Sequence, residues 1–256
     1  IHLNKVRHAN GLPCYDSQHD VFRGTKILVN TAFGLDYARQ LPSTVDMVGP
    51  ILPSVHVHNS SREIPLPAGV SKWLKEANEM SRYRSPFKHG HADGADEDDR
   101  EMDDGHIDSD HSSIGSGSHG GHGGSPPFVV FVNFGWMTKL DKEQLSALVN
   151  GLTDPRLLVL WPMSNEQMKA SMPTTVPPSF RLVNKLGGAT FRVLEHPAVK
   201  MVLSHCGLGV AQEALVHGKP LLCLPLFGDQ IDVAARVKDA NVGLVLNKVR
   251  LSAAEV

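Results

Sequence analysis

The chain has few cysteines, no long apolar run and no basic stripe, and each scarcity argues against a class of protein. Its three cysteines, Cys14, Cys206 and Cys223, are odd in number and far apart, which argues against a disulfide framework and favours a reducing compartment. No apolar run approaches the roughly 18 residues that a membrane-spanning helix needs. A net charge of −2 without any basic stripe gives no reason to expect a nucleic-acid partner. We therefore expect a cytoplasmic protein and leave membrane association of the intact protein open.

A change of composition interrupts the chain at residues 84–125. This segment is rich in Asp, Gly, Ser and His and has very few large apolar side chains. Because it cannot bury enough surface to offset its ordering entropy, we expect a disordered insert. Six histidines lie within it, at spacings that match no closed metal site, so a specific metal site is the less favoured reading: His89, His91, His106, His111, His119 and His122.

Short apolar segments alternate with helical ones from residue 126 onward. Strands are expected at 128–133, 157–161, 180–184, 201–204, 221–224 and 243–246, and helices at 141–152, 191–195, 210–216 and 231–239. Because the strands are apolar throughout, they predict a parallel sheet that is covered on both faces. Ligands of such sheets bind beyond the carboxyl ends of the strands. Upstream, residues 26–31 are strand-like, and residues 68–80 have the spacing of an amphipathic helix.

The most informative stretch runs from residue 201 to residue 243. His205, Gly207 and Gly209 form a turn at an expected helix N-terminus, where free N–H groups and the helix dipole favour an anion. The two glycines are expected to allow positive φ and a close approach of a phosphate. The turn therefore predicts a binding site for a phosphorylated ligand.

Three further polar residues of this stretch suit a sugar. Glu213 lies one helical turn beyond Gly209, where its carboxylate could accept hydrogen bonds from ribose hydroxyls, and Asp229 and Gln230 follow the next strand. Each has a simpler alternative: Glu213 could be a solvated helix residue, Asp229 could cap the following helix, and His205 could be a packed turn histidine. The shared position at one end of the sheet favours the ligand interpretation.

The sequence HCGLGVAQEALVHGKPLLCLPLFGDQ resembles the donor-binding signature of the UDP-glycosyltransferase superfamily. The matching positions keep the spacing of the signature: His205, Gly207, Gly209, Glu213, Ala214, Gly218, Pro220, Pro225, Asp229 and Gln230. Residues 129–137 resemble the first strand and loop of the family's C-terminal domain. Residues 27–52 resemble the segment that leaves its N-terminal domain.

The resemblance implies an α/β fragment of a two-domain GT-B glycosyltransferase, with a Rossmann-like parallel sheet. Four parts are expected: the end of the acceptor domain and its exit segment at 1–55, an interdomain linker with a short helix at 56–83, the insert at 84–125, and a C-terminally truncated donor domain at 126–256. The implied reaction transfers a hexose from a nucleoside diphosphate sugar, UDP-linked by resemblance, to a hydroxyl of a small or lipophilic acceptor.

The resemblance also implies which residues act. The donor is expected to contact Gly135, His205, Gly207, Gly209, Glu213, Asp229 and Gln230. The family's catalytic base lies in the N-terminal domain, so no catalytic residue is expected here and the fragment alone should be inactive. The UDP-sugar is a co-substrate, and neither a metal nor another cofactor is expected.

Four positions depart from the family pattern. Gly187 and Thr190 stand where the family has a base-stacking Trp and a Gln, Trp136 follows the loop glycine where Ser or Thr is usual, and Val210 replaces a hydroxyl. Loss of an aromatic platform would remove about 1–3 kcal/mol of stacking, unless Trp136 or Phe191 covers the base. Two alternatives stay open: a non-catalytic donor-binding subunit and a degenerate, non-enzymatic relative.

Overall fold

The computed structural model describes residues 2–17, 20, 25–32, 34–51, 64–83, 126–163, 166 and 170–256. The expected insert at 84–125, with its six histidines, lies outside the described residues. Its disorder and its lack of a metal site therefore stay predictions.

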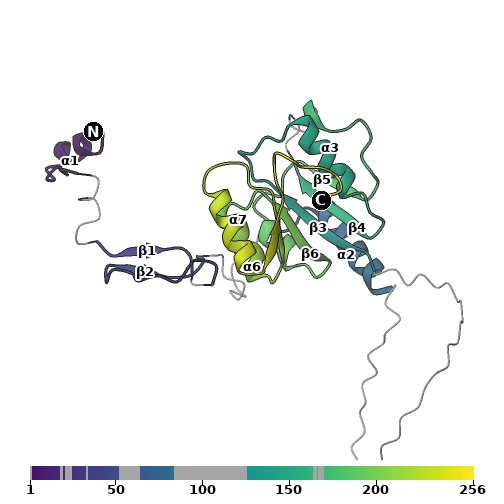
Figure 1. Ribbon diagram of the computed structural model, residues 1–256, viewed down its shortest axis with the longest axis horizontal. Helices are drawn as coiled ribbons and strands as arrows, with labels where there is room; N and C mark the ends of the chain where they lie inside the picture. Colours follow the sequence, from purple (N-terminus) through teal and green to yellow (C-terminus); the bar gives the residue numbers. More distant parts are fainter. Residues whose placement is uncertain are drawn as a thin grey trace, which may run out of the picture.

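A six-stranded parallel sheet forms the centre of the C-terminal part (Figure 1). The strands are β3 (Phe128–Asn133), β4 (Leu157–Pro162), β5 (Phe180–Val183), β6 (Val199–Ser204), β7 (Leu221–Cys223) and β8 (Gly243–Val245). Neighbouring strands pair in the order β5-β4-β3-β6-β7-β8, and every pair is parallel. The expected α/β fold with a Rossmann-like parallel sheet is confirmed.

The order of the strands reverses between β3 and β6. The chain runs outward from β3 through β4 to β5, then returns to the other side of β3 and continues through β6, β7 and β8. At such a reversal the connections leave in opposite directions, and a crevice opens outside the carboxyl ends of the two central strands. The loops that follow Asn133 and Ser204, the last paired residues of β3 and β6, flank this crevice.

Helices cover both faces of the sheet. They are α2 (Ala68–Tyr83), α3 (Lys142–Gly151), α5 (Thr190–Glu195), α6 (Leu208–Val216) and α7 (Gln230–Asp239). One apolar core joins α2, α5, α6 and α7 to the sheet, and a second core lies under α3. Val70 and Leu74 of α2 are almost fully buried in the first core, so this helix of the expected linker packs on the six-stranded sheet.

The N-terminal part contains α1 (His2–Ala9) and a two-stranded parallel sheet of β1 (Ile27–Val29) and β2 (Val45–Met47). The sequence predicted β1 but not β2. The β1–β2 pair lies on the same side of the large sheet as α6 and α7 (Figure 1). There Gln212 Nε2 donates to the backbone oxygen of Asn30 at 2.6 Å. The division into domains at residues 55, 83 and 125 stays a prediction. Among the helices of the described residues, none is long and apolar enough to cross a membrane.

Candidate functional site

The loops that follow β3, β6 and β7 meet in one pocket of about 230 Å³ at the carboxyl ends of the strands. It is lined by Phe134, Gly135, Trp136, Met137, Thr138, His205, Gly207, Phe227, Asp229 and Gln230. Five of the seven predicted donor residues are among them. The other two, Gly209 and Glu213, lie on α6 outside this lining.

The imidazole of His205 sits between two glycines of the pocket. A Cβ built on Gly207 would come within 2.7 Å of His205 Nε2, and one built on Gly135 within 3.4 Å of Cε1. A separation of 2.7 Å is closer than real Cβ contacts. The absence of a side chain at Gly207 therefore makes room for the ring of His205.

Burial has the largest effect on the pKa of His205. It lowers the pKa of the imidazole, whereas the backbone carbonyl of Asn133 and the carboxylate of Asp229 raise it to a smaller extent. Nδ1 is buried and has no hydrogen-bond partner of good geometry among the described residues. The ring is therefore biased towards its neutral form until an anion arrives.

The turn before α6 is built differently from the sequence expectation. Gly207 is the N-cap residue with φ −60° and ψ 144°, Gly209 lies in the first turn of α6, and the positive φ of 59° falls on Cys206 instead. Neither Gly207 nor Gly209 uses the positive φ that glycine allows. What Gly209 supplies is space, because a Cβ there would meet nothing within 4 Å, so a ligand can approach the free N–H groups at the helix start.

Asp229 and Gln230 have different tasks at the start of α7. Asp229 occupies the N-cap position but its side chain makes no capping hydrogen bond, and the residue is exposed. The capping alternative therefore fails, and the carboxylate is available to a ligand. Gln230 is buried, and its Oε1 accepts from the backbone N–H groups of Leu226 at 2.9 Å and Phe227 at 3.1 Å. Its carbonyl oxygen holds the loop, and only the amide N–H groups remain for a ligand.

Glu213 lies half-buried on α6, one turn past Gly209. Burial raises the pKa of its carboxyl group. Its position on the helix matches the sequence prediction, but it is separate from the lining of the pocket.

Cys206 and Cys223 are joined in a disulfide, with Cα atoms 5.3 Å apart, so the expectation of no disulfide is wrong. The physical reason is the register of the sheet. Ser204 at the end of β6 pairs with Cys223 at the end of β7, which brings the turn residue Cys206 alongside. A separation of 17 residues in sequence gave no sign of this proximity. Cys14 is free and exposed.

The structure shows the surroundings of Gly187 and Trp136, two of the positions that depart from the family pattern. Gly187 and Gly188 have φ of +60° and +87°, a conformation in which a Trp side chain would be strained. Phe191 packs edge to face against His217, with ring centroids 4.3 Å apart. Trp136 is 91% exposed and lines the pocket, so of the two aromatic candidates it is the one free to meet a ligand.

Sequence reasoning missed an apolar rim on the pocket. Met137 and Phe227 line it together with Trp136, and both are largely exposed. The available signal was the presence of large apolar residues in the loops that follow β3 and β7, where polar and small residues are usual.

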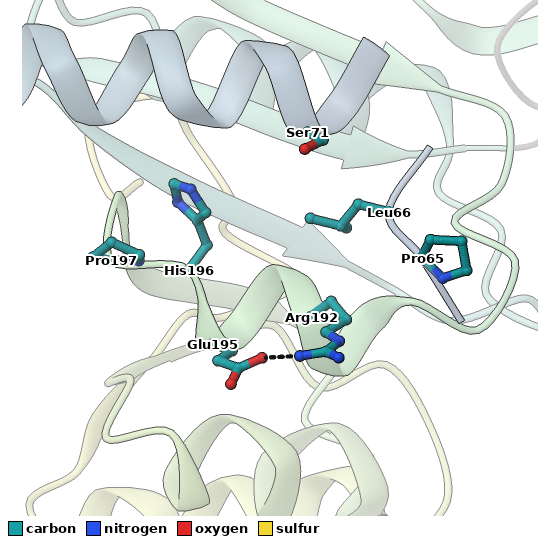
Figure 2. Close-up of a pocket in the computed structure, with 7 residues that line it drawn as sticks. All are labelled: Pro65, Leu66, Ser71, Arg192, Glu195, His196 and Pro197. Atoms are coloured by element: carbon teal, nitrogen blue, oxygen red, sulfur yellow. Dashed lines mark hydrogen bonds and ion pairs between the residues drawn. The ribbon is translucent and has the colours of Figure 1, made fainter. Parts of the chain in front are cut away.

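A second cavity, of about 470 Å³, lies between the start of α2 and the end of α5. Figure 2 shows its lining, in which Arg192 and Glu195 form an ion pair of 2.9 Å and His196 faces the helix α2. None of the predicted donor residues contributes to it. The cavity is separate from the candidate site.

A family model described as UDP-glucuronosyl and UDP-glucosyl transferase matches residues 113–256, more than half of the chain. The chain belongs to this family of UDP-glycosyltransferases. UDP-glycosyltransferase 84A3 of Arabidopsis thaliana is 34% identical over 120 residues, which cover 44% of this chain and 24% of the relative. UDP-glycosyltransferase 1 of Phaeomoniella chlamydospora is 28% identical over 233 residues, which cover 90% of this chain and 38% of the relative.

The chain is also similar to a solved structure. Os79 from O. sativa in complex with UDP is 28% identical, with a TM-score of 0.46, and the match covers 51% of this chain and 30% of that one. The chain spans between about a quarter and two fifths of the length of the curated relatives named above.

Proposed function

We propose that this chain is the donor-binding part of a glycosyltransferase that transfers a hexose from a UDP-sugar to a hydroxyl of a small or lipophilic acceptor. The observation that carries the proposal is the pocket at the strand-order reversal, where His205, the start of α6 and Asp229 converge. Membership of the UDP-glycosyltransferase family supports the donor class. Relatives named linamarin synthase 1 and anthocyanidin 3-O-glucosyltransferase 2 support a small acceptor.

In this proposal the diphosphate of the donor binds at the start of α6. The first N–H groups of a helix have no partner within the helix, and the helix dipole adds partial positive charge. His205 Nε2 faces the same turn beside Gly207. As the bond to the sugar breaks, negative charge grows on the departing diphosphate, and these donors stabilise it.

The sugar is proposed to lie against α7. The exposed carboxylate of Asp229 accepts hydrogen bonds from sugar hydroxyls, and the amide N–H groups of Gln230 donate to them. Gly135, in the loop after β3, lets the donor approach from the other side. Glu213 is proposed to accept from the ribose.

The base that deprotonates the acceptor is proposed to come from the acceptor domain, so that the 256-residue chain binds donor without turnover. We also propose that no metal is needed, since His205 and the helix start supply the positive charge. Transfer by the intact protein should then be unchanged by EDTA. A loss of transfer that Mg²⁺ or Mn²⁺ restores would show that the diphosphate needs a cation.

Calorimetric titration of the chain with UDP, UDP-glucose, UDP-N-acetylglucosamine and ADP-glucose tests the proposal. Binding of UDP and at least one UDP-sugar, with weaker binding of ADP-glucose, is the expected result. Binding of none of them would favour a degenerate relative. Binding by the intact protein without transfer to any hydroxyl acceptor would favour a donor-binding subunit.

A further inference from the structure

The segment 27–51 is tied to both helices that carry the donor pocket. Gln212 of α6 is buried and donates to the backbone oxygen of Asn30 at 2.6 Å. Tyr37 Oη donates to the carboxylate of Asp239 on α7 at 2.6 Å, although the two residues are 202 positions apart. The start of α6 bears the phosphate-binding turn, and the start of α7 bears Asp229.

The centre of this contact is a buried ion pair between Asp36 and Arg236. Arg236 Nη1 lies 3.4 Å from Asp36 Oδ1, and the two side chains are only 18% and 4% exposed. The second guanidinium nitrogen, Nη2, lies 2.6 Å from Asp232, one turn earlier on α7. Arg236 thus bridges a carboxylate of its own helix and a carboxylate of segment 27–51.

Local contacts hold Asp36 in place for this pairing. Its Oδ1 accepts from the backbone N–H of Tyr37 at 3.0 Å, its own N–H donates to the oxygen of Ala32, and Arg39 approaches its Oδ2 at 3.5 Å. Burying a charged group is costly unless it is paired and hydrogen-bonded, and these contacts supply both. Removing one partner of a buried pair leaves the other charge uncompensated, so the pair is sensitive to loss of either member.

Helix α7 connects this ion pair to the donor pocket. Arg236 is seven residues from Asp229, about 10 Å along the helix. Gln230, at the first position of the helix, holds the backbone of Leu226 and Phe227 and lines the pocket. A small rotation or translation of α7 would therefore move Asp229, Gln230 and the loop together, and sub-ångström placement matters for ligand contacts.

We propose that Asp36 and Arg236 are positioning residues for the donor site: their ion pair fixes α7 against segment 27–51 and thereby places Asp229 and Gln230 for the sugar. The proposal rests on the proposed function in one respect, namely that α7 contacts the sugar. It adds that the sugar contacts depend on residues outside the pocket, on the segment that resembles the exit from the acceptor domain.

The test compares Asp36→Asn with Asp46→Asn in the 256-residue chain. Asp46 is a matched control, because it lies in the same segment and pairs with Lys26 at 3.0 Å, but both side chains are about half exposed. Asp36→Asn should weaken UDP-glucose binding about tenfold and change UDP binding less than twofold. Asp46→Asn should change neither. Asp36→Glu should recover part of the loss.

A double-mutant cycle separates positioning from general destabilisation. Arg236→Gln leaves the buried Asp36 carboxylate with Arg39, itself about half exposed, as its remaining charged partner. It should therefore weaken UDP-glucose binding more than Asp36→Asn/Arg236→Gln does. Equal losses for UDP and UDP-glucose in step with a lower Tm would overturn the proposal, as would wild-type binding of UDP-glucose by Asp36→Asn.

Hydrogen exchange tests the coupling without a ligand. Asp36→Asn should speed exchange of the amides at residues 229–233 about tenfold relative to Asp46→Asn. Unchanged exchange there would refute the coupling even if donor binding fell. If the wild-type chain bound no nucleotide sugar, the proposed function would fail, and the exchange experiment would still decide whether Asp36 and Arg236 position α7.

Discussion

His205 occupies the space that a side chain on Gly207 would need. The Nε2 atom lies 2.7 Å from the Cβ that any other residue would place there, and a Cβ on Gly135 would also lie near the ring, 3.4 Å from Cε1. The backbone of Gly207, with φ −60° and ψ 144°, is open to all residues. The requirement for glycine at this position therefore comes from the histidine and not from the backbone.

We expect Gly207→Ala to displace the imidazole of His205. The displaced ring would lose its contact with the diphosphate, so the variant should lose about tenfold to hundredfold in UDP affinity, the equivalent of a charge-assisted hydrogen bond of 1.5–3 kcal/mol. His205→Ala should cost the same. The double variant should be no worse than His205→Ala, which calorimetry can measure. Additive losses would show that Gly207 acts independently of the ring.

The stability of the chain should fall as the pH drops below neutrality. Burial is the first cause of a lowered pKa at His196, His205 and His217, so each binds protons less readily in the folded chain than in the unfolded one. Below an unfolded pKa of about 6.5, the unfolded chain takes up more protons, and the free energy of unfolding decreases. Urea titrations between pH 8 and pH 5 should show this, with a shallower slope for His205→Gln. A slope identical to the wild type would mean that His205 is not buried.

Binding of UDP should be coupled to proton uptake at His205. A diphosphate beside the ring favours its charged form and raises the pKa that burial lowers. Affinity should therefore increase as the pH falls towards the free pKa of the ring. Calorimetry in buffers of different ionisation enthalpy near pH 6.5 should reveal the uptake. His205→Gln is the control, and an equal uptake in that variant would assign the proton to another group.

Asp229 and Gln230 are adjacent but should respond differently to substitution. Asp229→Ala removes an exposed carboxylate that caps nothing, so the Tm should hold while UDP-glucose binds more weakly and UDP does not. Gln230→Ala removes the acceptor for two backbone N–H groups, so it should lower the stability by about 1–3 kcal/mol. Melting curves and paired titrations with UDP and UDP-glucose distinguish the two. Similar melting losses for both would mean that Asp229 has a structural task as well.

The parallel sheet, and the position of the pocket at the carboxyl ends of its strands, were predictable from the sequence because both depend on the local pattern of apolar runs and turns. Short, continuous apolar runs such as that at 128–132 favour buried strands because they are too short for helices and are bounded by turn residues. The turns at Gly135, His205 and Asp229 each follow such a run. Parallel strands bring their carboxyl ends to one edge, so the convergence of these turns follows from the fold class alone. The helix bounds agree within three residues, as for α2, which ends at Tyr83 instead of residue 80.

What the sequence did not predict depends on contacts across the fold. The disulfide between Cys206 and Cys223 requires the register of β6 against β7, and the pair of Asp36 with Arg236 joins segments 200 residues apart. The positive φ at Cys206 was assigned to glycines because glycine has no steric penalty there. In the folded chain the positive φ falls on Cys206, which the glycine pattern did not indicate.

Replacing Val210 by threonine should strengthen UDP binding. It is the third residue of α6, at the position where the family has a hydroxyl, and it packs only partly against the core. Thr has nearly the volume of Val, and its hydroxyl could donate to a phosphate oxygen at the start of the helix. One such hydrogen bond contributes about 0.5–1.5 kcal/mol, so Val210→Thr should tighten UDP binding about twofold to tenfold.

Val210→Ala is the control for this gain, since it removes both γ-methyl groups without adding a hydroxyl, whereas threonine replaces one of them by a hydroxyl. It should bind UDP no better than the wild type and should melt at a lower temperature. UDP affinity that rises equally in both variants would attribute the gain to the loss of a γ-methyl group and not to the added hydroxyl. An unchanged affinity in Val210→Thr, with its Tm maintained, would place the diphosphate away from the third residue of α6 and shift it towards the His205 side of the turn.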